Sequence, residues 1–546
     1  MTTPLFEPDS DLVTGPSVPG APTEPVLDVD DIQGAVLPGF GTTCQHVVAL
    51  RFPDADTLRK WLRAPHVRVS TLAEVLAQRN KRRCAARAGE QRPPTPVMRC
   101  LALSIDGLRM LSAEADRVTD PAFKAGMAFR STLLGDPQDE HTDGHRSTWR
   151  FGGTPATTPH VVAVLAAERD LDLDEAVGKL LDASGSATVL FQQRGRVLPG
   201  ETEHFGFRDG VSQVGVRGRL SDAERHYLTR RWLDPALPPA RTHARPGQPL
   251  VWPGQFVFGY PGSHPHDPLV PGPVVSGGPA WTKNGSLLAF RRLRQDVETF
   301  RAFLTAESAA LRAQPGFADV DTERLAAALV GRWPDGSALV RNPQRADPVD
   351  ATDMLCTNAF GFARATPEAR VCADPMVARE PLALAPAGEL RTVRGAPADA
   401  DGLACPAFAH IRKVNPRDLG TDKGGAAETL AMQMLRRGIT WGEAHVEGEA
   451  PQARDRGLLF MSYQTSLVRQ FELMSTTWMN KRNAPEGNSG HDLLLGQTGD
   501  GQPRVAELTR GDHSRTITVA DRWVIPTGGG YFFAPSRSAL EQFASG

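Results

Sequence analysis

One stretch of the chain, residues 405–442, collects side chains that could hold a metal-containing group. It offers one imidazole, His410, which can bind a metal through a neutral nitrogen. Cations follow it and could bind an anionic ligand. They are Arg412, Lys413, Arg417, Arg436 and Arg437. A lone histidine in a polar segment is more often a surface or packed residue, so this stretch alone does not establish a metal site.

A second stretch, Gly206 to Gln213, places the carboxylate of Asp209 between two glycines. Glycines that flank an acid usually mark a turn, and a plain aspartate turn is the simplest interpretation. A carboxylate fixed on a turn can also transfer protons. The two stretches become informative in combination.

Together these segments resemble the dye-decolorising peroxidases, a family of haem peroxidases. The family's G-x-x-D-G motif matches Gly206 to Gly210. Its histidine segment A-H-x-R-K-x-N-P-R matches Ala409 to Arg417, and its arginine segment L-R-R-G-I matches Leu435 to Ile439. Further matches occur in the family's order at residues 284–293, 456–464 and 526–535. The resemblance covers nearly the whole chain from about residue 30, and the long insertions are similar to those of the longer bacterial branch.

The resemblance implies a role for each candidate catalytic residue. His410 is expected to be the axial ligand of the haem iron, with Glu472 as a candidate acceptor for its second ring nitrogen. Asp209 is expected to move the proton of hydrogen peroxide on the opposite face. Arg436 is expected to stabilise charge as the O–O bond breaks, and Arg437 is the competing assignment.

The resemblance also implies how the cofactor is held. Arg417 is expected to pair with a haem propionate, and Gly206 and Gly210 are expected to shape the cofactor-binding segment. Cys405 lacks the C-x-x-C-H arrangement that attaches c-type haem. We therefore expect one non-covalently bound haem b per chain.

The activity implied by the resemblance is that of a peroxidase. Hydrogen peroxide would oxidise phenolic or dye-like donors in one-electron steps through a ferryl intermediate. We expect an acidic pH optimum, because an aspartate stays a base in mildly acidic solution where a histidine would be protonated. Trp441, close in sequence to Arg436, is a hypothetical electron relay.

Three alternatives stay open at this point. The chain could be a haem carrier or store without turnover, an enzyme that removes iron from haem, or an interaction protein on the same scaffold. A carrier needs neither Asp209 nor Arg436, so the presence of both favours the enzyme.

Composition excludes several other classes. A net charge of −2 over 546 residues gives no support for nucleic-acid binding. The six cysteines form no disulfide framework, and no apolar run is long enough to span a bilayer. Residues 1–26 are rich in Pro, Gly and Thr without a signal-peptide pattern, which predicts a flexible tail and a cytoplasmic location, with leaderless export as the alternative. The oligomeric state stays open.

Periodicity predicts an α+β fold with two ferredoxin-like βαββαβ lobes, antiparallel sheets and long loop insertions. The first lobe, residues 27–232, contains strands near 45–52, 97–104, 159–166 and 187–193, with helices near 54–63 and 171–183. A Pro-rich link follows at 233–253. The second lobe, residues 254–546, contains strands near 286–292, 439–442, 458–463 and 531–534, with helices near 295–312 and 466–479. Insertions are expected at 65–96, 263–279, 336–353 and 380–404.

Overall fold

The structure, a computed structural model, describes residues 17–372, 390–446 and 455–546. The N-terminal half contributes four strands to a large sheet in the order β4-β1-β3-β2, all antiparallel. The strands are β1 (Cys44–Arg51), β2 (Met98–Leu103), β3 (Val161–Ala167) and β4 (Thr188–Arg196). Helices α1 (Ala55–Leu62) and α5 (Asp170–Ser184) connect them, so the predicted βαββαβ order is present.

The C-terminal half repeats this arrangement. Its strands lie in the order β13-β15-β10-β18, which is again fourth, first, third, second when read from β18. They are β10 (Ser286–Gln295), β13 (Leu435–Arg436), β14 (Ile439–Trp441), β15 (Gly457–Gln464) and β18 (Val524–Ala534), with β14 also paired to β15. The two halves therefore share one topology, although their sequences show little similarity.

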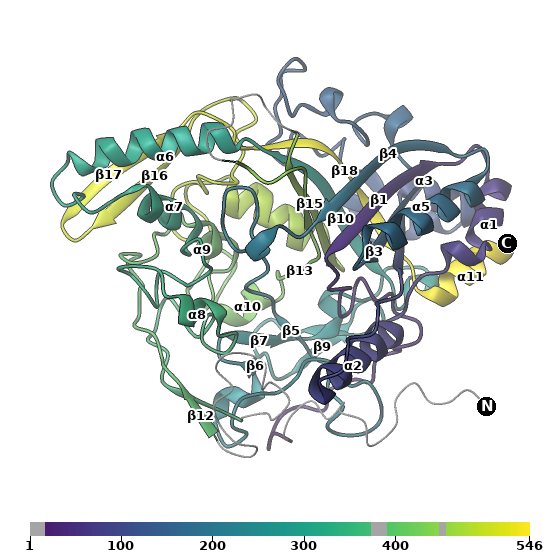
Figure 1. Ribbon diagram of the computed structural model, residues 1–546, viewed down its shortest axis with the longest axis horizontal. Coiled ribbons are helices and arrows are strands. Elements are labelled where there is room, and N and C mark those ends of the chain that lie inside the picture. Colours follow the sequence, from purple (N-terminus) through teal and green to yellow (C-terminus); the bar gives the residue numbers. More distant parts are fainter. Residues whose placement is uncertain (1–16, 373–389, 447–454) are drawn as a thin grey trace.

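The four strands of the first half and the five of the second join into one nine-stranded sheet that curves around an apolar interior (Figure 1). At one junction β18 pairs with β2 through Phe533 and Leu103. At the other, the hydroxyl of Thr440 in β14 donates to the carbonyl of Arg196 in β4. A side chain at Gly195 would collide there with Ile439, whose Cγ2 lies 2.4 Å from the position a Cβ would take. The predicted α+β fold with two ferredoxin-like lobes and antiparallel sheets is confirmed.

Alternate residues of the barrel strands face different layers. In β3, Val162 and Val164 pack inward in the same cluster as Tyr463, while Val161 and Leu165 face the outer helices. This strand is buried on both faces, which explains its unbroken apolar sequence. The outer layer is formed by α1, α5, α3 (Ile105–Leu111) and α11 (Arg537–Ser545), seen together at the right of Figure 1.

The two predicted helices of the second lobe differ in helix type: one is an α-helix and the other is π-helical. The predicted helix at 295–312 is α6 (Val297–Arg312), which begins after the N-cap Asp296. The predicted helix at 466–479 is π-helical over Val468–Glu472 and Met474–Met479. π-Helical geometry is rare and often accompanies functional sites. This segment packs against α9 (His410–Val414), which carries the candidate metal ligand.

The predicted insertions hold short elements of their own. The segment 65–96 contains α2 (Leu72–Ala88), which starts with a capping box between Thr71 and Glu74. The Pro-rich segment 233–253 contains β6 and β7, so it is more than a link. Residues 380–389 of the last insertion lie outside the described residues. The other short elements are α4 (Pro121–Ala125), α7 (Thr322–Val330), α8 (Pro348–Thr352), α10 (Ala426–Leu430), β5 (Gly215–Val216), β6 (His243–Arg245), β7 (Gln248–Val251), β8 (Pro261–Ser263), β9 (Pro271–Val274), β11 (Ala369–Cys372), β12 (Leu390–Val393), β16 (Arg504–Arg510) and β17 (His513–Val519).

Part of the predicted tail is packed against the body. Residues 1–16 lie outside the described residues, but Glu24 is buried, and its carboxylate accepts hydrogen bonds from the guanidinium groups of Arg217 and Arg231. The ordered chain therefore starts before residue 27, because this carboxylate neutralises two buried cations. The lobe boundaries at residues 232 and 254 stay a prediction.

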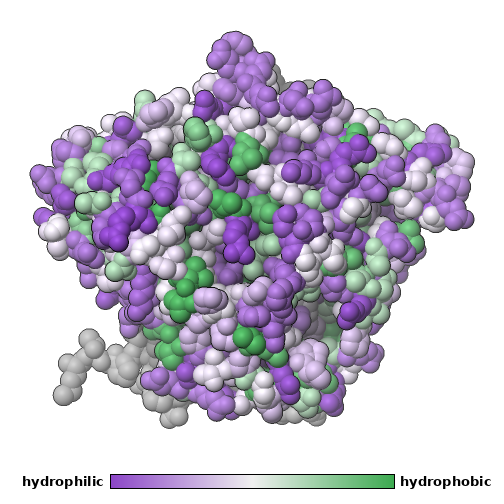
Figure 2. All heavy atoms as spheres, turned by 180° about the vertical axis from the view of Figure 1, so that it is seen from behind, coloured by the Kyte–Doolittle hydropathy of each residue, from purple (hydrophilic) through white to green (hydrophobic). Residues whose placement is uncertain are grey.

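The surface is mostly hydrophilic. In Figure 2, polar residues dominate the face seen from behind, and apolar residues form small scattered groups. Among the described residues, no helix combines the length and the apolar character that crossing a bilayer requires.

Candidate functional site

His410 begins helix α9 and is held from one side by a buried carboxylate. Its Nδ1 lies 2.7 Å from Oδ2 of Asp492, whose side chain is fully buried. Within the described residues, Nε2 of His410 has no hydrogen-bond partner, and the side chain is 25% exposed. An imidazole that is oriented through one nitrogen and open at the other is the usual form of a histidine ligand to a metal.

Asp492 is itself fixed in orientation. Its Oδ1 accepts the backbone N–H groups of Leu494 and Leu495 at 3.0 and 2.9 Å. Burial alone would raise the pKa of Asp492, but the contact with His410 and the N–H donors outweigh it, so the pKa lies below its ordinary value. The carboxylate stays ionised and can accept the Nδ1 proton of His410.

The prediction that Glu472 accepts from His410 is wrong. Glu472 forms a bidentate ion pair with Arg130 and accepts a hydrogen bond of 2.9 Å from the hydroxyl of Tyr531. These partners occupy both carboxylate oxygens of Glu472, which lies on the π-helical segment. Asp492 was missed because the sequence Asp-Leu-Leu-Leu signals only a local aspartate turn, and its contact with His410 spans 82 positions.

Lys413 fixes helix α9 to the loop that leads to Asp492. Its ammonium is buried and has four oxygen acceptors, among which Gly490 O lies at 2.6 Å. The other three are Lys481 O, Ala484 O and Ser489 Oγ. Burial lowers the pKa of Lys413 to about 8 despite three nearby carboxylates. Lys413 thus connects the helix that carries His410 to the loop that leads to Asp492.

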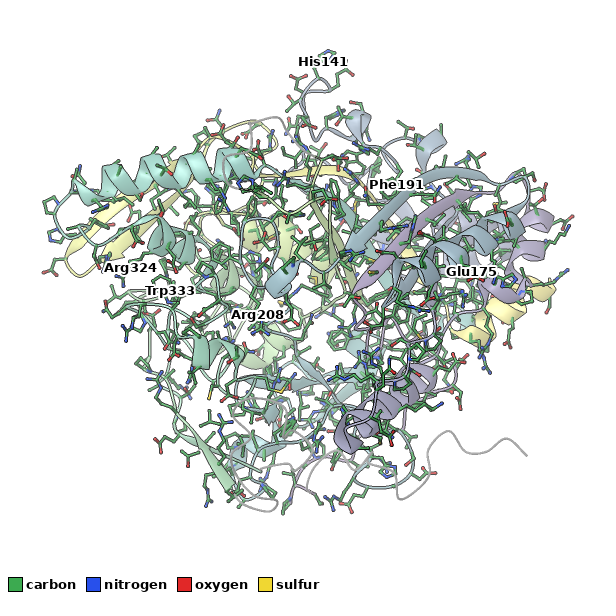
Figure 3. The ribbon with its side chains drawn as sticks, viewed as in Figure 1. His141, Glu175, Phe191, Arg208, Arg324 and Trp333 are labelled. Carbon is green, nitrogen blue, oxygen red and sulfur yellow. The ribbon has the colours of Figure 1, made fainter. Side chains whose placement is uncertain are left out.

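The segment around Asp209 is a tight turn. Gly206 and Gly210 have φ angles of 99° and 72°, which only glycine adopts without strain. Asp209 is exposed, and its Oδ1 accepts the N–H of Gly210 at 2.6 Å. The adjacent Arg208 donates its backbone N–H to Pro334 O, which places the turn beside Trp333, as Figure 3 shows.

The side chain of Glu203 fixes the backbone of this turn. Its carboxylate accepts the N–H groups of Phe205 and Phe207 at 3.0 and 2.9 Å, and the side-chain amide of Gln295 at 2.5 Å. Burial raises the pKa of Glu203 to about 7, and the nearby charge of Asp209 acts in the same direction.

Arg436 reaches the same turn from β13. Its guanidinium donates to Ser212 O at 2.6 Å, and its backbone carbonyl accepts the side-chain amide of Gln213 at 3.0 Å. Arg437 points elsewhere, because its guanidinium donates to the carbonyls of Ala35 and Val36. The structure therefore brings Arg436, and not Arg437, to the segment that carries Asp209.

A group of cations without acidic partners adjoins the turn. Arg417 and Arg332 form no ion pair with any described carboxylate. Arg417 donates to the carbonyls of Asn358 and Phe360, while Arg332 donates to Oδ1 of Asn358. Asn358 in turn donates to Val211 O beside Asp209. One asparagine thus links the turn to both guanidiniums.

These two arginines repel each other. Burial and, to a lesser extent, the charge of Arg332 lower the pKa of Arg417 to about 9, and burial lowers the pKa of Arg332 to about 10. Arg417 also has a φ of 56°, which is uncommon for a residue with a side chain. Buried cations with only neutral acceptors fit an anionic ligand, such as the propionates of a porphyrin.

The residues therefore fit the cofactor that the resemblance implies. Within the described residues, no group of three or more His, Cys, Asp or Glu side chains could hold a bare metal ion. A single open imidazole suits an iron whose other ligands come mainly from a porphyrin. The unpartnered cations suit its carboxylates.

Trp441 is a poor candidate for an electron relay. It is buried, and the guanidinium of Arg292 lies 3.7 Å from its ring centroid. No described residue accepts a hydrogen bond from its indole N–H. A cation over the ring disfavours loss of an electron from the indole, and no base is present to take its proton.

Fold and site together define a two-lobed α+β barrel protein with an open histidine that is oriented by a buried carboxylate. The family described as "DyP dimeric alpha+beta barrel domain" matches residues 31–199. A dye-decolorizing peroxidase of Mycena epipterygia is 28% identical over 100% of this chain and 92% of its own length. The multifunctional dye peroxidase of an Amycolatopsis species is also 28% identical, over 97% of this chain and 99% of its own.

Solved structures agree. An ancestral D-type dye decolorizing peroxidase superposes with a TM-score of 0.73 at 27% identity, covering 94% of this chain and 99% of that one. A dye-decolorizing peroxidase in complex with 2,6-dimethoxyphenol gives a TM-score of 0.70 at 26% identity, with coverage of 95% and 100%. Residues 31–199 thus match the barrel domain of this family, and nearly the whole chain is similar to dye-decolorizing peroxidases. Its similar proteins include fungal and bacterial enzymes, so the comparisons do not single out the bacterial branch.

Proposed function

We propose that this chain binds one non-covalent haem b and uses hydrogen peroxide to oxidise phenolic or dye-like donors by one-electron steps. The observation that carries this proposal is the pairing of two features: an open, carboxylate-supported His410, and a separate turn that carries Asp209 and accepts a hydrogen bond from Arg436 at Ser212 O. A haem carrier requires no such acid and guanidinium. The related proteins named as peroxidases support the same choice.

Each residue has a defined task in this proposal. Bound haem would supply the iron at which peroxide is reduced, and the donors would then give their electrons to the oxidised haem. Nε2 of His410 binds the iron, and Asp492 strengthens that ligand by accepting the Nδ1 proton. Arg417 and Arg332 hold the propionates.

Asp209 and Arg436 act on the peroxide. The carboxylate of Asp209 accepts the proton from one peroxide oxygen and returns it to the other. The guanidinium of Arg436 donates hydrogen bonds to the oxygen that gains negative charge. Because an aspartate remains a base in mildly acidic solution, the reaction is expected to run best at acidic pH.

Substitutions of the two residues test this assignment. We expect Asp209→Asn to lower kcat/KM for hydrogen peroxide by about 100-fold or more. Haem affinity, measured by Soret titration, should stay unchanged, because Asp209 does not bind the cofactor. Glu201→Gln is the matched control, since it removes an exposed acid that pairs with Arg208 on the same turn. Full activity of Asp209→Asn would overturn the proposal.

The proposal also includes the cellular location of the protein. We expect the protein to act in the cytoplasm, on the basis of its N-terminal composition. Cell fractionation with an antibody against the C-terminal helix would test this location, and recovery from the culture medium alone would contradict it.

A further inference from the structure

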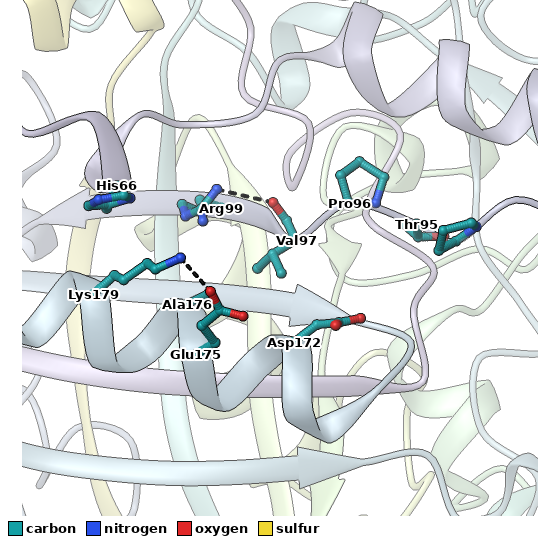
Figure 4. A pocket seen from close by; sticks show the side chains of 10 residues that line it. His66, Thr95, Pro96, Val97, Arg99, Asp172, Glu175, Ala176 and Lys179 are labelled. Atoms are coloured by element: carbon teal, nitrogen blue, oxygen red, sulfur yellow. Dashed lines mark hydrogen bonds and ion pairs between the residues drawn. The ribbon is translucent and has the colours of Figure 1, made fainter.

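A cavity on the outer face of the N-terminal half lies away from the residues described above. It has a volume of about 420 Å³, within the range of small-ligand sites, and opens between helix α5 and the first residues of β2 (Figure 4). In Figure 3, Glu175 marks this side of the molecule, at the right, whereas Arg208 and Trp333 lie left of centre. The cavity is thus separate from the turn that carries Asp209.

The acids of the cavity are already neutralised on their own helix. Glu175 pairs with Lys179 one turn later at 2.5 Å, as Figure 4 shows. Asp172 forms a bidentate pair with Arg169 at 2.8 and 2.6 Å. Both pairs lower the pKa of their carboxyl groups. Neither acid is free to neutralise a cation on the opposite wall.

Arg99 is the cation on that opposite wall. Its flanking residues on β2, Met98 and Cys100, point into the barrel, so Arg99 lies on the outer face. One guanidinium nitrogen donates to Val97 O at 3.2 Å, while the buried Nε has no partner within the described residues. No described carboxylate forms an ion pair with it. Burial and the neighbouring guanidinium of Arg68 both lower the pKa of Arg99, and Arg68 is itself paired with Glu74.

The remaining walls are mostly apolar. They are formed by Pro94, Pro96, Val97 and Ala176, together with Thr95 and His66. The cavity therefore combines one uncompensated guanidinium with a mostly apolar lining. Such a site matches a ligand with one negative charge and an apolar body, because a second negative charge would have no partner.

We infer that this cavity binds a small monocarboxylate with an aromatic or short apolar body. The planar carboxylate pairs with the guanidinium of Arg99, and the apolar body lies against the prolines and Val97. This inference is independent of the peroxidase chemistry, since it needs neither His410 nor Asp209.

Benzoate is a suitable probe for the haem-loaded full chain. We expect isothermal titration to show one saturable benzoate site that Arg99→Gln weakens about tenfold or more, as expected for loss of a charge-assisted pair. Arg68→Gln, the matched control, removes a neighbouring guanidinium that already has an acid partner and should change the affinity by less than about twofold. Benzamide, which has the same shape without the charge, should not bind.

Further measurements keep the test decisive. Arg99→Lys keeps the charge and the aliphatic stem, so it preserves the fold if Arg99→Gln does not, and it should still weaken benzoate by loss of the planar fork. A benzoate affinity that is equal in wild type, Arg99→Lys and Arg99→Gln would overturn the inference. Competition by sulfate as strong as that by benzoate would also overturn it, because the apolar walls would then have no role.

Discussion

At the scale of single residues, the histidine and its acceptor illustrate what a sequence can and cannot reveal. His410 was predictable, because its neighbours match a family segment. Asp492 was not, because an aspartate 82 positions away carries no sign of the imidazole that it will contact. Arg436 was preferred to Arg437 from the sequence alone, and the structure adds that the guanidinium of Arg436 is the one that reaches Ser212.

Asp492→Asn should weaken the histidine ligand. An asparagine accepts the Nδ1 proton less strongly, so we expect a 10- to 100-fold loss of haem affinity, the typical effect of removing such a partner. Soret titration of apoprotein measures it. Glu472→Gln, the residue first expected in this role, should destabilise the fold through Arg130 but leave haem affinity unchanged. The opposite pattern would restore Glu472 as the acceptor.

Glu203 should make stability depend on pH. Its pKa is about 7 in the folded protein and 4.5 ordinarily, so between these values the folded state keeps a proton that the unfolded state has lost. The free energy of unfolding should therefore fall as pH rises from about 4.5 to about 7 and then level off. Urea unfolding across this range should show a shallower fall for Glu203→Gln, and identical profiles would contradict the burial of this carboxyl group.

Trp441→Phe should leave oxidation of a bulky dye within about twofold of wild type. Arg292 over the indole ring disfavours a positive charge there, so electrons are expected to take another route. Steady-state kinetics with a dye too large for the haem pocket provides the measurement. A loss of tenfold or more would show that Trp441 is a relay after all.

At the scale of elements, regular periodicity was the reliable signal. The strand β3 and helix α6 were predicted to within about two residues, because continuous apolar sequence and a helical apolar face leave few alternatives. The π-helical segment 468–479 was predicted only as a helix, since its apolar residues do not distinguish the two helix types. Helix α2 was not predicted as a separate element, because its arginines interrupt the apolar periodicity of a helix.

Lys413→Met should loosen the join between α9 and the loop before Asp492. The substitution leaves four oxygen acceptors without their donor in a buried place, which we expect to cost about 2 kcal/mol or more. Urea unfolding measures the loss. Lys481→Met, an exposed lysine on the same loop, should change stability by less than about 0.5 kcal/mol. Equal effects of the two substitutions would show that the anchor is unimportant.

At the scale of the whole molecule, the two lobes share one sheet. No local sequence pattern predicts that the strands of the two lobes will join into it. The order of strands and helices predicted each lobe, but the contact of β14 with β4 depends on residues more than 200 positions apart. Gln33 strengthens the other junction, because its side chain donates to the carbonyls of Leu101 within β2 and of Pro535 directly after β18.

Gln33→Leu should therefore weaken the union of the lobes. We expect wild type to unfold in one calorimetric transition and Gln33→Leu to unfold at a lower temperature with a broader transition, because two buried carbonyls lose their donor. Gln91→Leu, at an exposed position, should unfold like wild type. A sharp, unshifted transition for Gln33→Leu would mean that the lobes are held elsewhere.

The position of β18 has a consequence for synthesis on the ribosome. This strand lies between β10 and β2, yet it is the last strand of the chain to leave the exit tunnel. Until then the nascent polypeptide presents two unpaired strand edges, which are prone to associate with other chains. Premature termination upstream of residue 524 would leave those edges permanently open, so truncated products are expected to accumulate as aggregates or be degraded.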